Sequence, residues 1–188
     1  LSSWSSIGSD SSTYTLTQSE VGKYIKVTAS YTDDDGTVES HSDTHLIAVA
    51  NVNDAGTGLS LASDGTVADP DEDDELSATG TLADEDGVSG ASPTYVWKRA
   101  GTAISGATSS SYTLVQADVG TIISVVISYT DDESESNTIT LTAASDVDNV
   151  NDAPTVASAI SDVSHAEDAA YSLDASGTCT DVDGDSLI

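Results

Sequence analysis

Apolar and polar residues alternate most regularly between Thr121 and Thr130. The apolar positions of that segment are Ile123, Val125, Ile127 and Tyr129. Ser124 and Ser128 fall on the opposite face. Because successive side chains of a strand point to opposite faces of a sheet, this period of two predicts a half-buried β-strand.

The same reasoning predicts further strands. Lys23–Thr32 repeats the alternation, with Ile25, Val27, Ala29 and Tyr31 on its apolar face. Other strands are predicted at Leu76–Leu82, Thr94–Lys98, Ser110–Leu114 and Asn137–Ala143. Turn signals such as Asp86-Gly87 and Val119-Gly120 separate them, and no window keeps a helical period over a helical length. About seven short strands per repeat predict an all-β fold, with antiparallel strands in a two-sheet β-sandwich.

The pattern also recurs at a fixed interval of 98 residues. Asn51–Ala55 returns as Asn149–Ala153, and Ser30–Asp34 returns as Ser128–Asp132. Between Gly8 and Asp34, 16 of 27 positions match the residue 98 positions later, so the repeated unit is a whole domain and not a small solenoid unit. The predicted segments are the C-terminal part of one repeat at 1–50, a complete repeat at 51–150, and the N-terminal part of a third domain at 151–188.

Charge restricts the partners of this chain. It carries 33 acidic and four basic residues, for a formal net charge of −29. Such a charge repels nucleic-acid phosphates and anionic membrane surfaces, so we expect neither as a partner. No apolar run approaches the ~18 residues of a membrane span. The expected counterparts of the chain are therefore cations.

Carboxylates gather where the strand pattern places loops. The acidic groups are Asp33–Asp35, Asp69–Glu75, Asp84–Asp86, Asp131–Glu133, Asp146–Asp148 with Asn151–Asp152, and Asp181–Asp185. The loops of a sandwich lie at its two ends, so successive domains would bring acidic ends together. Ca²⁺ removes that conflict, because it takes roughly six to eight oxygen ligands from Asp, Glu, Asn and backbone carbonyls. A solvated acidic surface, adapted to high salt and binding no metal, is the alternative interpretation.

Two phrases of the complete repeat resemble the immunoglobulin-like family. Tyr95–Trp97 resembles the third strand, whose Trp packs between the sheets, and Gln116–Gly120 resembles the corner before the sixth strand. The paired cysteines of antibody-type domains are absent, because Cys179 is the single cysteine. The resemblance implies a sandwich that is not held by a disulfide.

A more detailed resemblance is to the tandem Ig-like and cadherin-like repeats of large bacterial surface adhesins, including the extender domains of RTX-type adhesins. The phrases that carry it are Ala103–Thr108, Tyr112–Leu114, Asp118–Gly120 and Val150–Pro154. Glu167–Leu173 and Asp181–Asp185 resemble the start of a bacterial cadherin-like domain. This family implies Ig-like and cadherin-like β-sandwiches joined in series.

The linker Asp148–Pro154 resembles the cadherin interdomain calcium linker, although Asn149 stands in place of an Asp and Ala153 in place of an Asn. The resemblance implies Ca²⁺ as the bound metal. It implies ligands Asn151, Asp152, Glu167 or Asp168, Asp181 and Asp183 at the second junction. At the first junction it implies Asn53, Asp54, Asp84 and Asp86, with Asp33 or Asp34 as further candidates.

These features together predict a calcium-stabilised extender segment of a secreted bacterial cell-surface adhesin, in which Ca²⁺ rigidifies the junctions. The expected partners are neighbouring repeats of the same chain. Segments 1–50 and 153–188 would each expose an unpaired sheet edge, which predicts head-to-tail self-association. The sequence shows no arrangement of a catalytic nucleophile with a base, and no set of pocket-forming residues, so we do not expect an enzyme. The alternative function is a carbohydrate- or protein-binding Ig-like module, for which Trp4 is the candidate contact.

Overall fold

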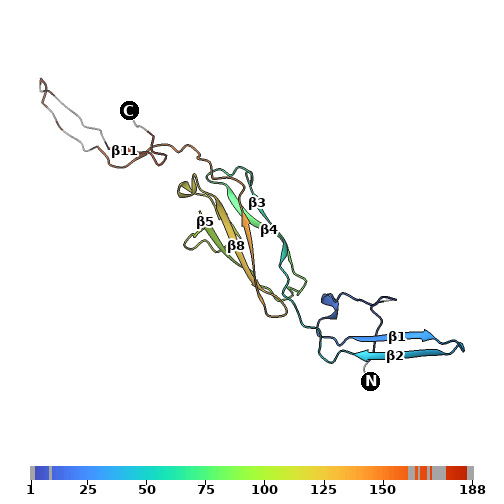
Figure 1. Ribbon diagram of the computed structural model, residues 1–188. Helices are drawn as coiled ribbons and strands as arrows, with labels where there is room; N and C mark the ends of the chain where they lie inside the picture. Colours follow the sequence, from blue (N-terminus) through green and yellow to red (C-terminus); the bar gives the residue numbers. More distant parts are fainter. Residues whose placement is uncertain are drawn as a thin grey trace. The chain divides into compact units, whose positions relative to one another are not determined.

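The computed structural model describes residues 3–8, 10–160, 164, 166–168, 170 and 177–185, so part of the predicted 151–188 domain lies outside the described residues. The chain forms two compact units (Figure 1). The first comprises Leu1–Gly56, Ala83–Ala91 and Thr130–Asn137; the second comprises Thr57–Leu82, Ser92–Tyr129 and Thr138–Ile188. Among the described residues, no helix is long and apolar enough to span a membrane.

The complete repeat contains two β-sheets. One has the strand order β3-β4-β7 and the other the order β6-β5-β8-β9. The strands are β3 (Thr57–Ser63), β4 (Glu75–Ala83), β5 (Thr94–Arg99), β6 (Thr102–Ala103), β7 (Ser111–Thr113), β8 (Ile123–Thr130) and β9 (Ser136–Thr142). β4 pairs antiparallel with β7, and β5 pairs antiparallel with both β6 and β8. The all-β sandwich predicted from the alternation is confirmed.

Strand β8 supplies the centre of the core in the second unit. Ile123, Val125 and Ile127 are completely buried, and they contact Trp97 of β5 and Leu76 of β4 in one apolar cluster. The cluster therefore joins side chains from both sheets. Full burial of an aliphatic side chain stabilises a fold by about 1.5–3 kcal/mol, so this stripe contributes much of the stability of the repeat.

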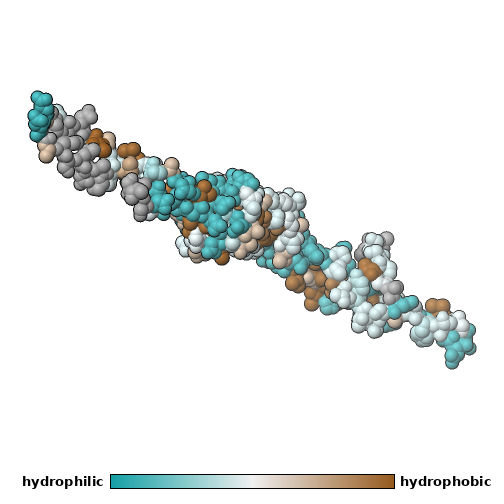
Figure 2. Space-filling view, turned by 90° about the horizontal axis from the view of Figure 1, so that it is seen from above, coloured by the Kyte–Doolittle hydropathy of each residue, from teal (hydrophilic) through white to brown (hydrophobic). Residues whose placement is uncertain are grey.

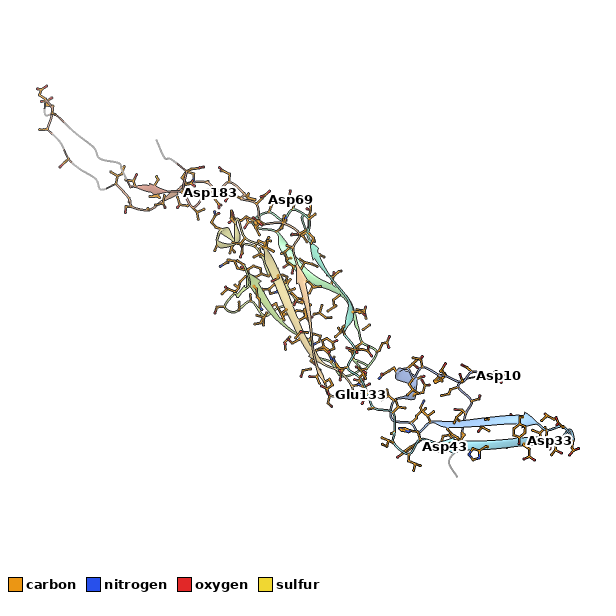
Figure 3. All side chains as sticks on the ribbon, in the orientation of Figure 1. Asp10, Asp33, Asp43, Asp69, Glu133 and Asp183 are labelled. Carbon is orange, nitrogen blue, oxygen red and sulfur yellow. The ribbon has the colours of Figure 1, made fainter. Side chains whose placement is uncertain are left out.

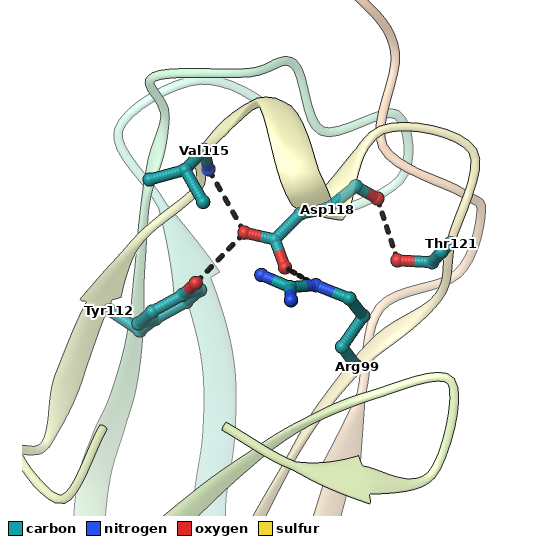
Figure 4. Close-up of polar contacts among 5 residues, drawn as sticks. All are labelled: Arg99, Tyr112, Val115, Asp118 and Thr121. Carbon is teal, nitrogen blue, oxygen red and sulfur yellow. Dashed lines mark hydrogen bonds and ion pairs between the residues drawn. The ribbon is translucent and has the colours of Figure 1, made fainter. Parts of the chain in front are cut away.

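Asp118 is the one fully buried carboxylate among the described residues, and it ends the short 3₁₀ turn η2 (Gln116–Asp118). Its carboxylate accepts hydrogen bonds from Arg99 Nε at 2.6 Å, from the Tyr112 hydroxyl at 2.9 Å and from the Val115 backbone N–H at 2.9 Å (Figure 4). The Thr121 hydroxyl donates to the Asp118 carbonyl. Burial, followed by the hydrogen bond to Asp118, raises the pKa of Tyr112 and keeps its hydroxyl a donor. These contacts fix η2 to the edge of the core.

We expect Asp118→Ala to lower the free energy of unfolding by about 1–3 kcal/mol, because the Tyr112 hydroxyl and the Val115 N–H lose their acceptor. The Arg99 side chain is 30% exposed and can be solvated by water. The measurement is denaturant unfolding of the full chain, with Ala117→Gly as the control in the same turn. A loss below about 1 kcal/mol for Asp118→Ala would show that the pair is not a structural anchor.

The first unit contains the turn η1 (Gln18–Glu20) and an antiparallel hairpin of β1 (Lys26–Thr32) and β2 (Val38–Thr44). The hairpin is paired from Lys26 with Thr44 through Thr32 with Val38. β1 and β2 lie 98 residues before β8 and β9, so the repeat in the sequence corresponds to a repeated pair of strands.

The alternation in β1 does not lead to burial. Val27 and Tyr31 are 63% and 66% exposed, whereas their repeat partners Val125 and Tyr129 are 0% and 4% exposed. The expectation of an inward apolar face at Lys23–Thr32 is therefore wrong for this unit. The reason is that β8 has β5 beside it and a second sheet against its face, and the described residues of the first unit supply neither. Apolar surface is visible among hydrophilic residues in Figure 2.

We expect this exposed face to drive concentration-dependent self-association of the chain, because an apolar strand with a free edge is a template for pairing. The double variant Val27→Ser/Tyr31→Ser should reduce the association measured by sedimentation velocity. Ser30→Ala, on the opposite face of β1, is the control and should behave as the wild type. A wild-type chain that stays monomeric at all concentrations would contradict the expectation.

The C-terminal segment begins with a small antiparallel pair, β10 (Thr155–Val156) and β11 (Cys179–Thr180). Thr155 pairs with Thr180 and Val156 with Cys179. The pair lies between the linker that precedes β10 and the acidic turn that follows β11. It therefore brings the linker and the acidic turn close together.

Candidate metal centre

Three acidic side chains from distant parts of the sequence converge in the second unit. Oxygen atoms of Glu72, Asp152 and Asp183 all lie within 4.8 Å of one another (Asp183 is labelled in Figure 3). Glu72 lies in the loop between β3 and β4 and is buried, Asp183 is half-buried and Asp152 is exposed. Asp181, Asp183 and Asp185 form a second convergent group within the same distance.

Backbone contacts position Glu72. Its N–H donates to the Asp148 carbonyl at 2.9 Å, and the Asp148 N–H donates to the Pro70 carbonyl at 2.9 Å. These two bonds hold the start of the linker against the β3–β4 loop. Glu72 is therefore fixed beside the residues that lead to Asp152.

Burial raises the pKa of Glu72, and the carboxylates of Asp152, Asp73 and Asp183 raise it further; a hydrogen bond from the Val150 backbone partly opposes the rise. The causes of this pKa include no basic side chain. A divalent cation would supply the missing positive charge, and carboxylate oxygens are the ligands that hard cations prefer.

Asp183 is held in a turn that also orients Asp152. The Asp152 N–H donates to Asp183 Oδ2 at 2.6 Å, and the Asp183 N–H donates to Asp181 Oδ1 at 3.0 Å. Gly184 follows with a φ of +80°, and its N–H donates to the Asp181 carbonyl. A residue with a side chain would be strained at that φ, so the turn favours Gly at position 184.

The same arrangement recurs in the first unit. The Asp54 N–H donates to Asp86 Oδ2 at 2.8 Å, and the Asp86 N–H donates to Asp84 Oδ1 at 2.9 Å. Gly87 has a φ of +87°, and its N–H donates to the Asp84 carbonyl. The linker Asp and the Asp-x-Asp-Gly turn are thus a feature of the repeat, which we call the linker clamp.

The clamp of the first unit contains a buried carboxylate oxygen without a donor. Asp86 is 4% exposed, and its Oδ1 has no hydrogen-bond partner. Outside the clamp, the side-chain oxygen of Asn51 is also buried and without a partner. A buried acceptor with no donor costs about 1–3 kcal/mol, so a cation at Asp86 Oδ1 would offset this penalty. Among the described residues of this unit, no three acidic groups converge as they do in the second.

Asn53, a predicted ligand, is engaged in a different contact. Its amide nitrogen donates to Asn137 Oδ1 at 2.9 Å, and the Asn137 amide donates back to Asn53 Oδ1 at 3.2 Å. Asn137 also donates to Asp131 Oδ2 at 2.8 Å. Both Asn137 and Asp131 are buried, so they fasten the linker to the β8–β9 loop. The sequence signal for them was a polar residue at the start of a strand and a carboxylate in a repeated phrase.

The structure places the other predicted residues as follows. Asn151 is exposed and donates to the Asp152 carbonyl. Glu167 and Asp168 are exposed and belong to neither convergent group. Asp33 accepts from the Asp35 and Thr37 N–H groups and so closes the β1–β2 turn. Sequence reasoning missed Glu72, which lies inside the acidic run Asp69–Glu75 but has nothing in that run to distinguish it.

No protein-family model matches this sequence, and a search of the curated proteins gives no match.

The raised pKa of Glu72 makes stability depend on pH in a definite direction. The folded state holds the proton more tightly than the unfolded state, so the contribution is fully present below the ordinary value of 4.5 and is lost as pH rises through the folded pKa. We expect Glu72→Gln to remove this loss, so the variant should be more stable than wild type at neutral pH in chelator.

Denaturant unfolding between pH 4 and pH 8 in chelator measures the effect as the difference between the two proteins. Glu133→Gln, an exposed position in the β8–β9 turn, is the matched control and should follow wild type. Parallel pH profiles for wild type and Glu72→Gln would mean that the cluster is not a source of repulsion.

Proposed function

We propose that this chain is a calcium-stabilised extender segment of a secreted bacterial cell-surface adhesin, with Ca²⁺ binding at the linker clamps and rigidifying the junctions between repeats. The observation that carries the proposal is the recurrence of the clamp in both units, with the same three hydrogen bonds donated by backbone N–H groups. In one copy a nearly completely buried carboxylate, Asp86, has an oxygen without a donor. In the other copy three carboxylates converge.

The recurrence supports a structural role over a catalytic one. An active site is a single constellation, whereas the clamp occurs twice. The linker Asp returns after 98 residues and the turn after 97, and in both copies the clamp joins a linker to an Asp-x-Asp-Gly turn. A feature that returns with every repeat supports a property that every repeat needs, such as attachment to the next domain.

Calcium is favoured over magnesium by the kind of ligand. The candidate groups are carboxylate and amide oxygens on loops with different degrees of exposure, and Ca²⁺ tolerates irregular coordination by roughly six to eight oxygens. Mg²⁺ demands a nearly octahedral set and gives up its waters reluctantly. Extracellular modules bind Ca²⁺ with dissociation constants of about 10⁻⁴–10⁻³ M, which suits a protein outside the cell.

One observation favours the second candidate, a carbohydrate- or protein-binding module. The first unit has a cavity of about 580 Å³ whose apolar lining includes Trp4, Tyr24, Ile25 and Leu46. Lys26 lies over the Trp4 ring at 5.8 Å from its centre. An aromatic ring beside a cavity is the kind of surface on which a sugar or an apolar side chain binds.

The proposed function is tested by thermal unfolding of the full chain in calcium, in magnesium and in chelator. Calcium at one hundred times its dissociation constant should stabilise each site by about 2.7 kcal/mol, which raises Tm by several degrees, and magnesium should have a much smaller effect. Asp183→Asn and Asp86→Asn should each remove part of this rise. Asp10→Asn, at an exposed residue outside both clamps, should keep all of it.

Identical melting curves in calcium, magnesium and chelator would overturn the proposed function. The acidic clusters would then be a solvated surface, and the cavity beside Trp4 would become the leading candidate site.

A further inference from the structure

The hairpin of the first unit repeats the backbone contacts of the β8–β9 hairpin. The parallel bridge between Val21 and Val49 corresponds to the bridge between Val119 and Val147, 98 residues later. In each copy the glycine that follows the first valine donates its N–H to the carbonyl of the second valine at 2.9 Å. Because the two hairpins are built alike, the strand that covers β8 indicates the kind of strand that β1 can accept.

Strand β5 covers β8 in the complete repeat. The two strands are antiparallel, with Trp97 opposite Val125 and Arg99 opposite Ile123. Trp97, Val125 and Ile123 are completely buried, and Arg99 Nε donates to the buried Asp118 at 2.6 Å. An aromatic side chain and a basic side chain two residues apart therefore fix β5 to β8.

The first unit contains the receiving half of this contact without the strand. Among its described residues β1 pairs with β2 alone, and β2 corresponds to the edge strand β9, so the open edge of β1 is the edge that β5 occupies on β8. The cavity of about 580 Å³ adjoins this strand, since its lining includes Lys26, the first residue of β1, together with Ile25 and Glu20. The counterparts of Ile25 and Glu20 are Ile123 and Asp118, which are completely buried beside β5.

Glu20 is the charged group that a basic side chain would meet in this cavity. It is 4% exposed, and within the described part of the chain it makes no ion pair. The two lysines that line the same cavity have other partners, since Lys23 donates to the Ser19 carbonyl and Lys26 lies over the Trp4 ring. Glu20 Oε1 accepts one hydrogen bond, from the Ser19 hydroxyl at 2.6 Å, and a carboxylate oxygen can accept two.

Charge decides between two occupants of this surface. A second copy of the chain that paired through its own β1 would bring another net charge of −29. A strand like β5 brings positive charge instead, since Lys98 and Arg99 are two of the four basic residues of the chain. Opposite charge speeds the encounter and favours the strand like β5.

We propose that the β1 edge of the first unit and its cavity bind an extended segment of another protein molecule, in which two aromatic side chains and a basic one occupy alternating positions, as Tyr95, Trp97 and Arg99 do in β5. The segment joins the sheet antiparallel to β1, with its second aromatic side chain opposite Val27 and its basic side chain opposite Ile25. Main-chain pairing supplies affinity, and the cavity with its carboxylate supplies specificity. This surface acts without calcium, so the inference goes beyond the proposed function and does not depend on it.

The test is a titration of a fluorescein-labelled peptide, with the sequence of residues 91–100, by the full chain, followed by fluorescence anisotropy. The chain is kept below the concentration at which it associates with itself, and the titration is run in chelator and in calcium at equal ionic strength. We expect saturable binding in both buffers. Peptides with Trp97→Ser or Arg99→Gln should bind at least about tenfold more weakly, because each loses one anchoring side chain.

Chain variants locate the bound peptide. Val27→Ser should weaken binding about tenfold, since it removes apolar contact from the receiving face, and Val27 is 63% exposed in the free chain, so the hairpin should stay folded. Thr28→Ser, on the opposite face of β1, is the matched control and should bind as the wild type does. Glu20→Gln should weaken binding of the wild-type peptide without further weakening the Arg99→Gln peptide, as a double-mutant cycle requires for a direct contact.

Three results would overturn the inference. No rise in anisotropy at any chain concentration would show that the surface accepts no such strand. Equal binding by wild type and Val27→Ser, or of the wild-type and Trp97→Ser peptides, would place the peptide elsewhere on the acidic chain. Dimers of the chain that persist in sedimentation velocity with excess peptide would make a second copy the occupant. The calcium melts test different residues, so either proposal can fail while the other stands.

Discussion

Negative charge without counter-charge is the constraint on which the candidate sites depend. The chain has four basic residues for 33 acidic ones, and Arg99 is used at 2.6 Å from the buried Asp118. The Asp118 contact shows what a fully compensated carboxylate looks like here, with three donors on two oxygens and no exposure. Glu72 shows the opposite condition, because the charges that act on its pKa are the carboxylates of Asp152, Asp73 and Asp183 and include no basic side chain. Under the proposed function, a cation from solution would supply this compensation.

Backbone geometry explains why the clamp recurs even though the flanking sequence changes. The turn needs a carboxylate to accept from the N–H two residues later, and then a glycine with positive φ, which Asp84 with Gly87 and Asp181 with Gly184 supply. The residue between the two acids differs, Glu85 in one copy and Val182 in the other, because its side chain takes no part. The second Asp of each turn then accepts the linker N–H. A few backbone hydrogen bonds are therefore enough to rebuild the clamp in a domain whose remaining sequence has diverged.

The sequence pattern predicted burial correctly for a strand that lies inside the complete repeat. The alternation at Ile123, Val125 and Ile127 predicted a buried strand, and the structure confirms it. Trp97 lies in the core, as the resemblance to Ig-like domains implied. The same alternation at Val27 and Tyr31 did not predict burial, because burial requires a second sheet and the pattern of one strand does not supply it. The short β10–β11 pair was missed for a related reason, since two residues per strand carry no period.

The candidate site was predictable only in part, since convergence of residues depends on tertiary structure. Asp152 and Asp183 were found because the acidic phrases that contain them resemble a known linker and its following turn. Glu72 was hidden among the five other acidic residues of the run Asp69–Glu75, and only the loop contact with Asp148 distinguishes it. Asn53 was expected to be a ligand because amides ligate calcium, but the pairing of Asn53 with Asn137 depends on a strand 84 residues away in the sequence.

Charge repulsion in the second unit has a consequence for folding without an ion. Burial raises the pKa of Glu72, and the carboxylates of Asp152, Asp73 and Asp183 raise it further. Ionising Glu72 at neutral pH therefore lowers the free energy of unfolding. Under the proposed function, an ion that binds only the folded state would offset this cost, and the stabilisation would grow with the excess of the ion over its dissociation constant. The same cluster would then be a source of instability without the ion and a source of stability with it.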